Sequence, residues 1–192
     1  YLNRAIFFLL LGSLLLGTGQ IALLPIWEGF DETAHFSYIQ QVADSGKLPL
    51  DGTDPISTDI EQYYDYAPVP QALSVEFISK DRLTYQSFFA KPAKFIARSK
   101  EFIHSDTGSP RKYVPGRGYS WEAQHPPLYY ILLSPVYLIT SSLSWGEQIF
   151  VLRVVSYLLA WLGLVIAVFT CLDIAKNQSS QNKIRQWNWA AI

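Results

Sequence analysis

The segment Ala5–Ile26 constrains this chain most, because it is almost wholly apolar over a length that can cross a bilayer. About 20 such residues span the hydrocarbon core, so we predict a first transmembrane helix within residues 1–26. A cleaved signal peptide has a shorter apolar core and ends in small residues. Here Pro25 and Trp27 stand at the end of the run instead, which indicates an uncleaved anchor.

A second apolar run, Ile149–Leu172, is also long enough to cross a bilayer. The composition agrees, since 16% of the residues are charged and soluble domains carry about 25%. A shorter run, Leu128–Leu143, contains Pro135 and falls short of a crossing. We therefore predict an all-α integral membrane protein.

The distribution of basic residues predicts the topology, because Lys and Arg collect on cytoplasmic flanks. Lys176, Lys183 and Arg185 follow the second run, and Arg4 precedes the first. Both flanks are therefore predicted to be cytoplasmic, in a multi-pass protein of the cell membrane whose residues 27–148 are extracytoplasmic. The predicted segments are a first span (1–26), an outer loop with juxtamembrane helices (27–127), a re-entrant or interfacial segment (128–148), a second span (149–172), a cytoplasmic loop (173–186) and the start of a further membrane helix (187–192). That last apolar run leads us to interpret the chain as the N-terminal part of a longer protein.

The outer region begins with a predicted helix, Asp31–Ser45, in which Asp31 can cap the N-terminus and Gly46 can end the helix. Prolines and glycines predict loops over Lys47–Gln71 and His104–Ser120. Between them, Ala72–Phe102 combines basic and aromatic residues. This composition fits one or two amphipathic helices, either on a membrane surface or in a small soluble core.

Two adjacent carboxylates, Asp31 and Glu32, follow the first span closely. Helix capping and the helix dipole alone favour acids there. Alternatively, a carboxylate at the mouth of a membrane cavity can accept a proton from a nucleophile or bind a cation. His35, one turn later, orients Asp31 or simply lies in the interface. His125 has the same two interpretations, and the rigid Pro126-Pro127 and the tyrosines behind it favour a site.

Carboxylates and imidazoles also raise the question of a metal, because Asp31, Glu32, His35 and His125 are possible ligands of a divalent ion. The chain has no close ligand spacing such as HExxH, so we do not favour a metal site and expect no required cofactor. The net charge of −1 gives no reason to expect nucleic acid as a partner.

Four basic residues are candidates for an anion site, namely Arg111, Lys112, Arg117 and Arg153. Basic residues in a Gly/Pro-rich loop are usually solvated. Arg153 differs because it lies inside the outer end of an apolar span, where a charge is costly and tends to be functional. It is expected either to bind a lipid phosphate or to extend its charge to the interface.

The order of motifs resembles a known family. An N-terminal membrane helix is followed by DETAHFSYIQQVADSGKLP, then EAQHPPLYYILL, then LRVVSYLLAWLGLVIAV. This series, from about Leu2 to Ala175, resembles the N-terminal part of the multi-pass GT-C glycosyltransferases. It is most similar to members akin to glycosyltransferase family 39, which are related to protein O-mannosyltransferases and aminoarabinose transferases. The family has many more helices.

The resemblance implies transfer of a sugar from a polyprenyl-phosphate carrier to an extracytoplasmic lipid, glycan or protein acceptor, with inversion at the anomeric carbon. It implies that the catalytic residues are Asp31, at the position of the family's catalytic acid, and its neighbour Glu32. It also places His125–Tyr130 in the motif that lines the same cavity. The residues expected to contact the substrate are His35, His125, Tyr129 and Arg153. Two alternatives stay open: an extracytoplasmic sensor domain between two spans, and a non-enzymatic export subunit.

Overall fold

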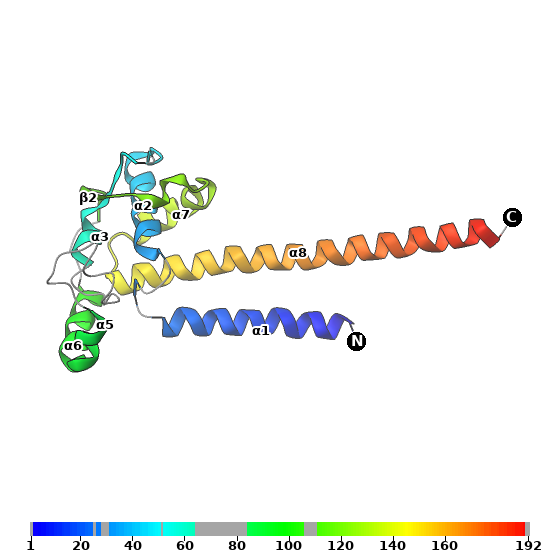
Figure 1. Ribbon diagram of the computed structural model, residues 1–192, viewed down its shortest axis with the longest axis horizontal. Coiled ribbons are helices and arrows are strands. Elements are labelled where there is room, and N and C mark those ends of the chain that lie inside the picture. The colour runs from blue at the N-terminus through cyan, green and yellow to red at the C-terminus, as the bar shows by residue number, and fades with distance from the viewer. Residues whose placement is uncertain are drawn as a thin grey trace. The chain divides into compact units, whose positions relative to one another are not determined.

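The computed structural model describes residues 2–24, 26–27, 31–50, 52–63, 84–105 and 111–190. Most of these residues are helical, and Figure 1 labels the elements along the chain. The chain divides into two compact units, one of Tyr1–Ala22 with Val154–Ile192 and one of Leu23–Arg153.

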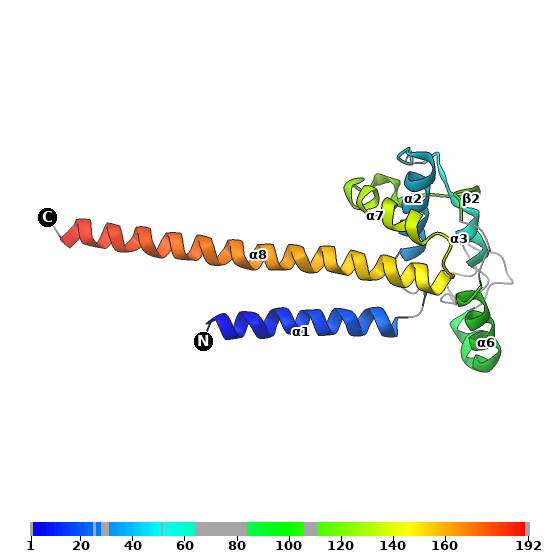
Figure 2. The same cartoon turned by 180° about the vertical axis from the view of Figure 1, so that it is seen from behind.

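The first unit contains α1 (Leu2–Leu23) and most of α8 (Trp145–Ala190). Among the described residues, two helical segments are long and apolar enough to cross a membrane, Arg4–Leu23 and Trp145–Gln178. These correspond to the two predicted spans. Within the unit α1 lies alongside α8 (Figure 2).

Two hydrogen bonds join the helices of this first unit. The hydroxyl of Tyr157 donates to the carbonyl of Ser13 at 2.5 Å, and Nε1 of Trp161 donates to the carbonyl of Leu10 at 3.2 Å. Gly17 lies directly against the Tyr157 ring. A small residue therefore allows the close approach of the two helices, as is common in apolar helix pairs.

Helix α8 differs from the expectation beyond Leu172. A cytoplasmic loop was predicted over 173–186 and a new helix from 187, but α8 continues as one helix to Ala190. No Gly or Pro occurs after Gly163 in the sequence, and Lys, Gln, Arg and Ala propagate a helix well. Nothing local therefore ends the helix where the apolar run ends.

The second unit is built around α2 (Glu32–Ser45) and α7 (Leu128–Thr140), which pack against each other. The rings of Tyr38 and Tyr130 stack with centroids 3.6 Å apart. Deeper in the interface, Nε2 of Gln40 donates to the Tyr137 hydroxyl at 2.9 Å. All four side chains are buried, so one face of α7 packs in the core, whereas Leu128 and Ile139 on the same helix are exposed. The expected helix Asp31–Ser45 is confirmed, and Gly46 ends it in the left-handed conformation.

A small antiparallel sheet lies beside α2 where we expected loops. Strand β1 (Pro55–Ser57) pairs with β2 (Pro115–Tyr119), and the helix α3 (Thr58–Tyr63) follows β1. Neither strand shows the alternation of apolar and polar residues that identifies a strand in a sequence. Their pairing joins segments far apart in the chain, which explains why local patterns did not predict it.

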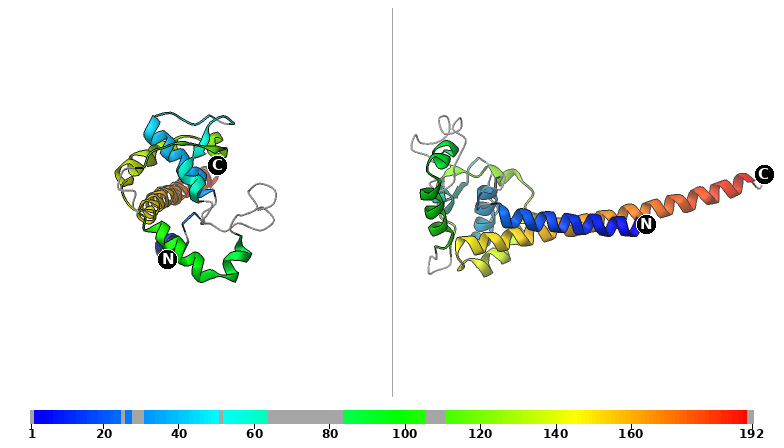
Figure 3. Two further views of the ribbon diagram at one scale, coloured as in Figure 1. Left: turned by 90° about the vertical axis from the view of Figure 1, so that its left-hand side faces the viewer. Right: turned by 90° about the horizontal axis from the view of Figure 1, so that it is seen from below.

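Two helices occupy the described part of the region predicted as amphipathic, α5 (Tyr85–Ala90) and α6 (Pro92–Ile103), drawn in green in Figure 3. Residues 72–83 of that prediction lie outside the described residues. Helix α6 approaches the start of α8 closely, because a Cβ on Gly146 would lie 2.6 Å from Cγ2 of Ile103.

Candidate functional site

The first turn of α2 holds Asp31 in a left-handed backbone conformation, with φ 51° and ψ 18°. The backbone carbonyl of Asp31 accepts a hydrogen bond from the N–H of His35 at 3.0 Å, but its side chain makes no capping hydrogen bond. The capping role considered for this carboxylate is therefore not used. Trp27 also has a positive φ, 67°, which is costly for a bulky residue. The connection into α2 therefore contains local backbone strain.

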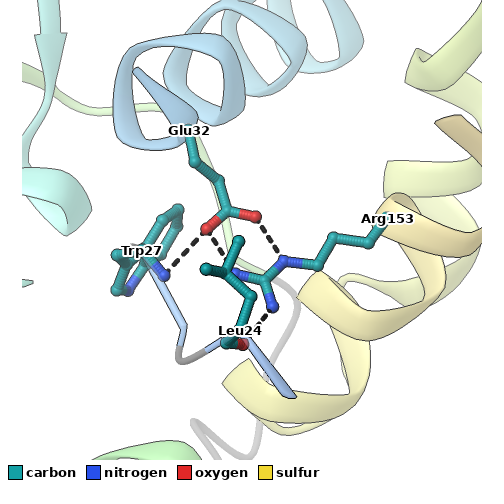
Figure 4. A network of polar contacts seen from close by, with 4 residues as sticks. All are labelled: Leu24, Trp27, Glu32 and Arg153. Atoms are coloured by element: carbon teal, nitrogen blue, oxygen red, sulfur yellow. Dashed lines mark hydrogen bonds and ion pairs between the residues drawn. The ribbon is translucent and has the colours of Figure 1, made fainter. Parts of the chain in front are cut away.

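Glu32 forms a bidentate ion pair with Arg153 (Figure 4). Nε of Arg153 lies 2.5 Å from Oε1 of Glu32, and Nη2 lies 2.7 Å from Oε2. A third nitrogen, Nη1, donates to the carbonyl of Leu24 at 2.6 Å, and the backbone N–H of Trp27 donates to Oε2 at 2.8 Å. The Glu32 carboxylate and the Arg153 side chain thus link the segment that follows α1 to the start of α8.

This contact bears on one of the two interpretations of Arg153, extension of its charge to the interface, and phosphate binding stays a prediction. The side chains of Arg153 and Glu32 are only 12% and 18% exposed, so the arginine does not extend its charge into solvent. A charge in an apolar helix is tolerated when it is paired. The partner is Glu32, one of the two residues we had assigned to the reaction itself.

His35 faces a different set of groups, contributed by α7 and by the 3₁₀ helix η1 (Trp121–Gln124). Its Nδ1 lies 3.0 Å from the hydroxyl of Tyr130 and 3.5 Å from Oε2 of Glu122. Nε2 of His125 lies 3.0 Å from the same oxygen. Two imidazoles therefore lie next to one carboxylate.

Glu122 is the buried centre of this cluster, with a side chain only 5% exposed. Its Oε2 accepts no hydrogen bond from any described residue, although the two histidine nitrogens lie near it. The 3.0 Å contact with His125 is thus close enough for a hydrogen bond but not aligned for one. A buried carboxylate oxygen without a hydrogen bond lowers the stability of the folded state. An N–H or O–H group aligned with Oε2 would remove this cost.

Tyr129 and Tyr130 complete the surroundings. The ring of Tyr129 lies with its centroid 6.4 Å from that of His35, and the rings of His35 and His125 are 6.0 Å apart. Burial raises the pKa of the Tyr130 hydroxyl, and the negative charge of Glu122 raises it further. Tyr130 therefore remains a neutral hydrogen-bonding group at physiological pH.

The structure separates the predicted site residues into two groups. His35, His125 and Tyr129 come together around Glu122, whereas Glu32 and Arg153 form their own pair. The four possible metal ligands do not meet at one point, and no group of three His, Cys, Asp or Glu suited to a metal occurs among the residues that the structure describes.

The other basic candidates have different surroundings. Arg111 is buried; its guanidinium lies 4.1 Å from the centre of the Trp145 ring, and Nη1 donates to Oε1 of Gln148 at 2.9 Å. Its contacts are those of a core residue. Lys112 and Arg117 are both exposed, although Arg117 lies on β2 and not in the loop that we predicted.

Glu122 was not singled out from the sequence as a site residue, and Tyr130 was predicted only as part of the motif His125–Tyr130. A signal existed, because Glu122 precedes His125 by three residues in EAQHPPLYY, a spacing that brings side chains together on a helical turn. Comparison with known proteins adds no assignment: no protein-family model, curated protein or solved structure matches this chain.

Proposed function

We propose that this chain is part of a membrane glycosyltransferase that moves a sugar from a polyprenyl-phosphate carrier to an extracytoplasmic acceptor. The observation that supports it best is the carboxylate of Asp31, which makes no capping hydrogen bond and is next in the chain to the Glu32–Arg153 pair, soon after a helix able to span a membrane. A base for the acceptor and a cation for a phosphate are the two groups that this transfer requires.

In the proposed reaction, Asp31 takes the proton of an acceptor hydroxyl or amine. The acceptor atom forms a bond to the anomeric carbon, and the bond from that carbon to the phosphate oxygen breaks. The phosphate leaves with the bonding electrons, and the configuration inverts. Asp31 and Glu32 are adjacent in the chain, and Glu32 is paired with Arg153. They cannot face each other across a bond as the carboxylates of a glycosidase do.

The phosphate of the donor is assigned to Arg153. An arginine fork matches phosphate and carboxylate geometry equally well, and Glu32 occupies that fork in the structure. The position of Arg153 within an apolar helix suits a head group whose tail stays in lipid. Glu32 is therefore reassigned in this proposal, from a reacting group to the residue that occupies the Arg153 fork until the donor phosphate displaces it.

A sensor is the second candidate, and one observation favours it. Helix α8 continues without a break beyond the apolar segment that ends at Gln178, and such a helix can transmit a movement across a membrane. In that case Asp31 has no chemical role. A sensor would show no sugar transfer under any condition, which separates the two functions.

The test is an assay of sugar transfer in membranes that contain the full-length protein, with labelled polyprenyl-phosphate sugars as donors. We expect Asp31→Asn to lower the rate about 10²–10⁴-fold, the usual contribution of a general base, with membrane insertion unchanged. Asp173→Asn is the matched control, because Asp173 is exposed on α8 and contacts only Asn177 in the described part of the chain. Transfer by Asp31→Asn at more than half the wild-type rate removes Asp31 from the mechanism.

A further inference from the structure

We propose that the exposed face of α7 binds the acyl chains of one leaflet of a membrane, with the helix lying in the membrane plane. The residues of this face are Leu128, Ile131, Leu132, Pro135, Leu138 and Ile139. The sequence left open whether residues 128–148 are re-entrant or interfacial, and the proposal selects the interfacial arrangement for α7. It does not depend on sugar transfer.

The polar groups of α7 are distributed in the reverse of the usual pattern. A helix at the surface of a soluble protein turns an apolar stripe to the core and its polar side chains to water. The buried side of α7 instead carries hydroxyl groups, on Tyr130, Ser134, Tyr137 and Thr140. Every side chain of the exposed face is hydrocarbon, and Ile139 is 80% exposed.

The exposed face is one continuous stripe, because its residues recur three or four positions apart along the helix. No charged residue occurs between Leu128 and Thr140. Beside the stripe, Tyr129 is 37% exposed, and tyrosine is common where a protein meets lipid head groups. A contiguous apolar surface of this kind marks the binding of a membrane or of another protein.

The buried hydroxyl groups favour lipid as the occupant, because they find their partners within the protein. The hydroxyl of Ser134 donates to the carbonyl of Tyr130 at 2.7 Å, and that of Tyr137 donates to the carbonyl of Arg111 at 3.1 Å. Lipid tails offer no hydrogen bonds, so a helix in contact with them must satisfy its polar groups internally. A protein partner usually adds hydrogen bonds and a polar rim, and the exposed face has no polar side chain to form them.

The covalent chain also keeps this face close to a membrane. Helix α8 begins at Trp145, and its segment Trp145–Gln178 is long and apolar enough to cross a bilayer. Five steps of about 3.8 Å separate the Cα atoms of Thr140 and Trp145, so the end of α7 lies within about 19 Å of the start of that segment. A bilayer crossed by α8 is therefore within reach of α7.

Helix α2 determines the orientation, because it packs along one side of α7 (Figure 1). His35 lies beside Tyr130, and Gln40 lies beside Tyr137, so the two helices run in the same direction. Asp44, one turn beyond Gln40, is exposed. A re-entrant α7 would take this carboxylate into the hydrocarbon, where a charge is costly. A helix in the membrane plane keeps it outside.

The experiment measures the depth of single side chains by quenching of a fluorescent label. The full-length protein, with its native cysteines replaced and thus with Cys171→Ala, receives one bimane-labelled cysteine through Leu128→Cys, Leu132→Cys or Ile139→Cys. Each protein is placed in nanodiscs of phosphatidylcholine that is brominated either near the head group or near the end of the acyl chain. Iodide in the buffer is the aqueous quencher.

Two further positions are controls. Lys47 is exposed and lies outside α7, so the label of Lys47→Cys should respond to iodide alone. Phe169 is 59% exposed in the apolar segment of α8, so the label of Phe169→Cys should respond to brominated lipid. On the exposed face of α7, we expect bromine near the head group to lower the emission at least twofold at all three positions. Bromine near the chain end should have a smaller effect, and iodide none.

Quenching by iodide at the three positions would show that the face lies in water, and quenching by neither agent would show that protein covers it. Either result overturns the proposal. Deeper burial of Ile139→Cys than of Leu128→Cys would show a re-entrant helix and would overturn it as well. A variant whose circular dichroism differs from that of the wild type is replaced by Ile131→Cys or Leu138→Cys. Loss of the proposed sugar transfer leaves each of these results unchanged.

Discussion

The Glu32–Arg153 pair allows the sharpest prediction about stability. Glu32→Ala removes two hydrogen bonds from Arg153 and one from the N–H of Trp27. Bonds to charged groups contribute about 1.5–3 kcal/mol each, and leaving one member of a buried pair alone costs about 3–5 kcal/mol. Arg153 keeps the carbonyl of Leu24, so we expect a loss near the lower end, about 3 kcal/mol in the free energy of unfolding.

The assay is unfolding of the full-length protein in mixed micelles, followed by tryptophan fluorescence. Asp31→Asn is the control one residue away, and we expect it to change stability by less than about 0.5 kcal/mol, because its carboxylate makes no cap. The double variant Glu32→Met with Arg153→Met should recover most of the loss, since a well-packed apolar pair can replace a buried ion pair. A cost below about 1 kcal/mol for Glu32→Ala, typical of an exposed pair, would refute this reasoning.

Two further predictions follow from packing and burial. Gly17→Ala places a Cβ into the Tyr157 ring and should weaken the packing of α1 on α8. The Cβ of the control Gly12→Ala meets nothing within 4 Å, so this variant should be neutral or stabilised by up to about 1 kcal/mol. The unfolding midpoints of the two variants are compared, and equal midpoints would contradict the close contact at Gly17. Burial raises the pKa of Asp59, so the folded state binds its proton more tightly and stability falls as pH rises from about 3.9 through the folded pKa. In unfolding midpoints measured over a series of pH values, Asp59→Asn should not show this fall of stability with rising pH. If the fall is unchanged in the variant, another group causes it.

The helical spans and the bounds of α2 followed from the sequence, because their causes are local. Hydropathy over one bilayer thickness identified the segments that became α1 and the apolar part of α8. Gly46 ended α2 as expected, since glycine adopts the left-handed conformation without strain. The end of α8 was not predicted, because polar residues that leave a membrane can still continue a helix.

The site was predicted in part. His35, His125 and Tyr129 share one cluster, but its centre, Glu122, was not recognised as a site residue. Burial made that carboxylate important, and burial depends on what α2 and α7 place over it. Similarly, Arg153 was recognised by its costly position in an apolar run, while its partner could not be read from the sequence.

By itself, then, the sequence determined which segments are apolar helices and which short stretches carry the acids, imidazoles and tyrosines. Only the tertiary structure decided which of these groups meet. Glu32 and Arg153 are 121 residues apart in the chain, and His35 and Tyr130 are 95 apart. Local patterns report on the few residues within one or two helical turns, whereas an ion pair or a buried carboxylate depends on packing between distant segments. That packing pairs Glu32 with an arginine, whereas the side chain of its neighbour Asp31 does not cap α2.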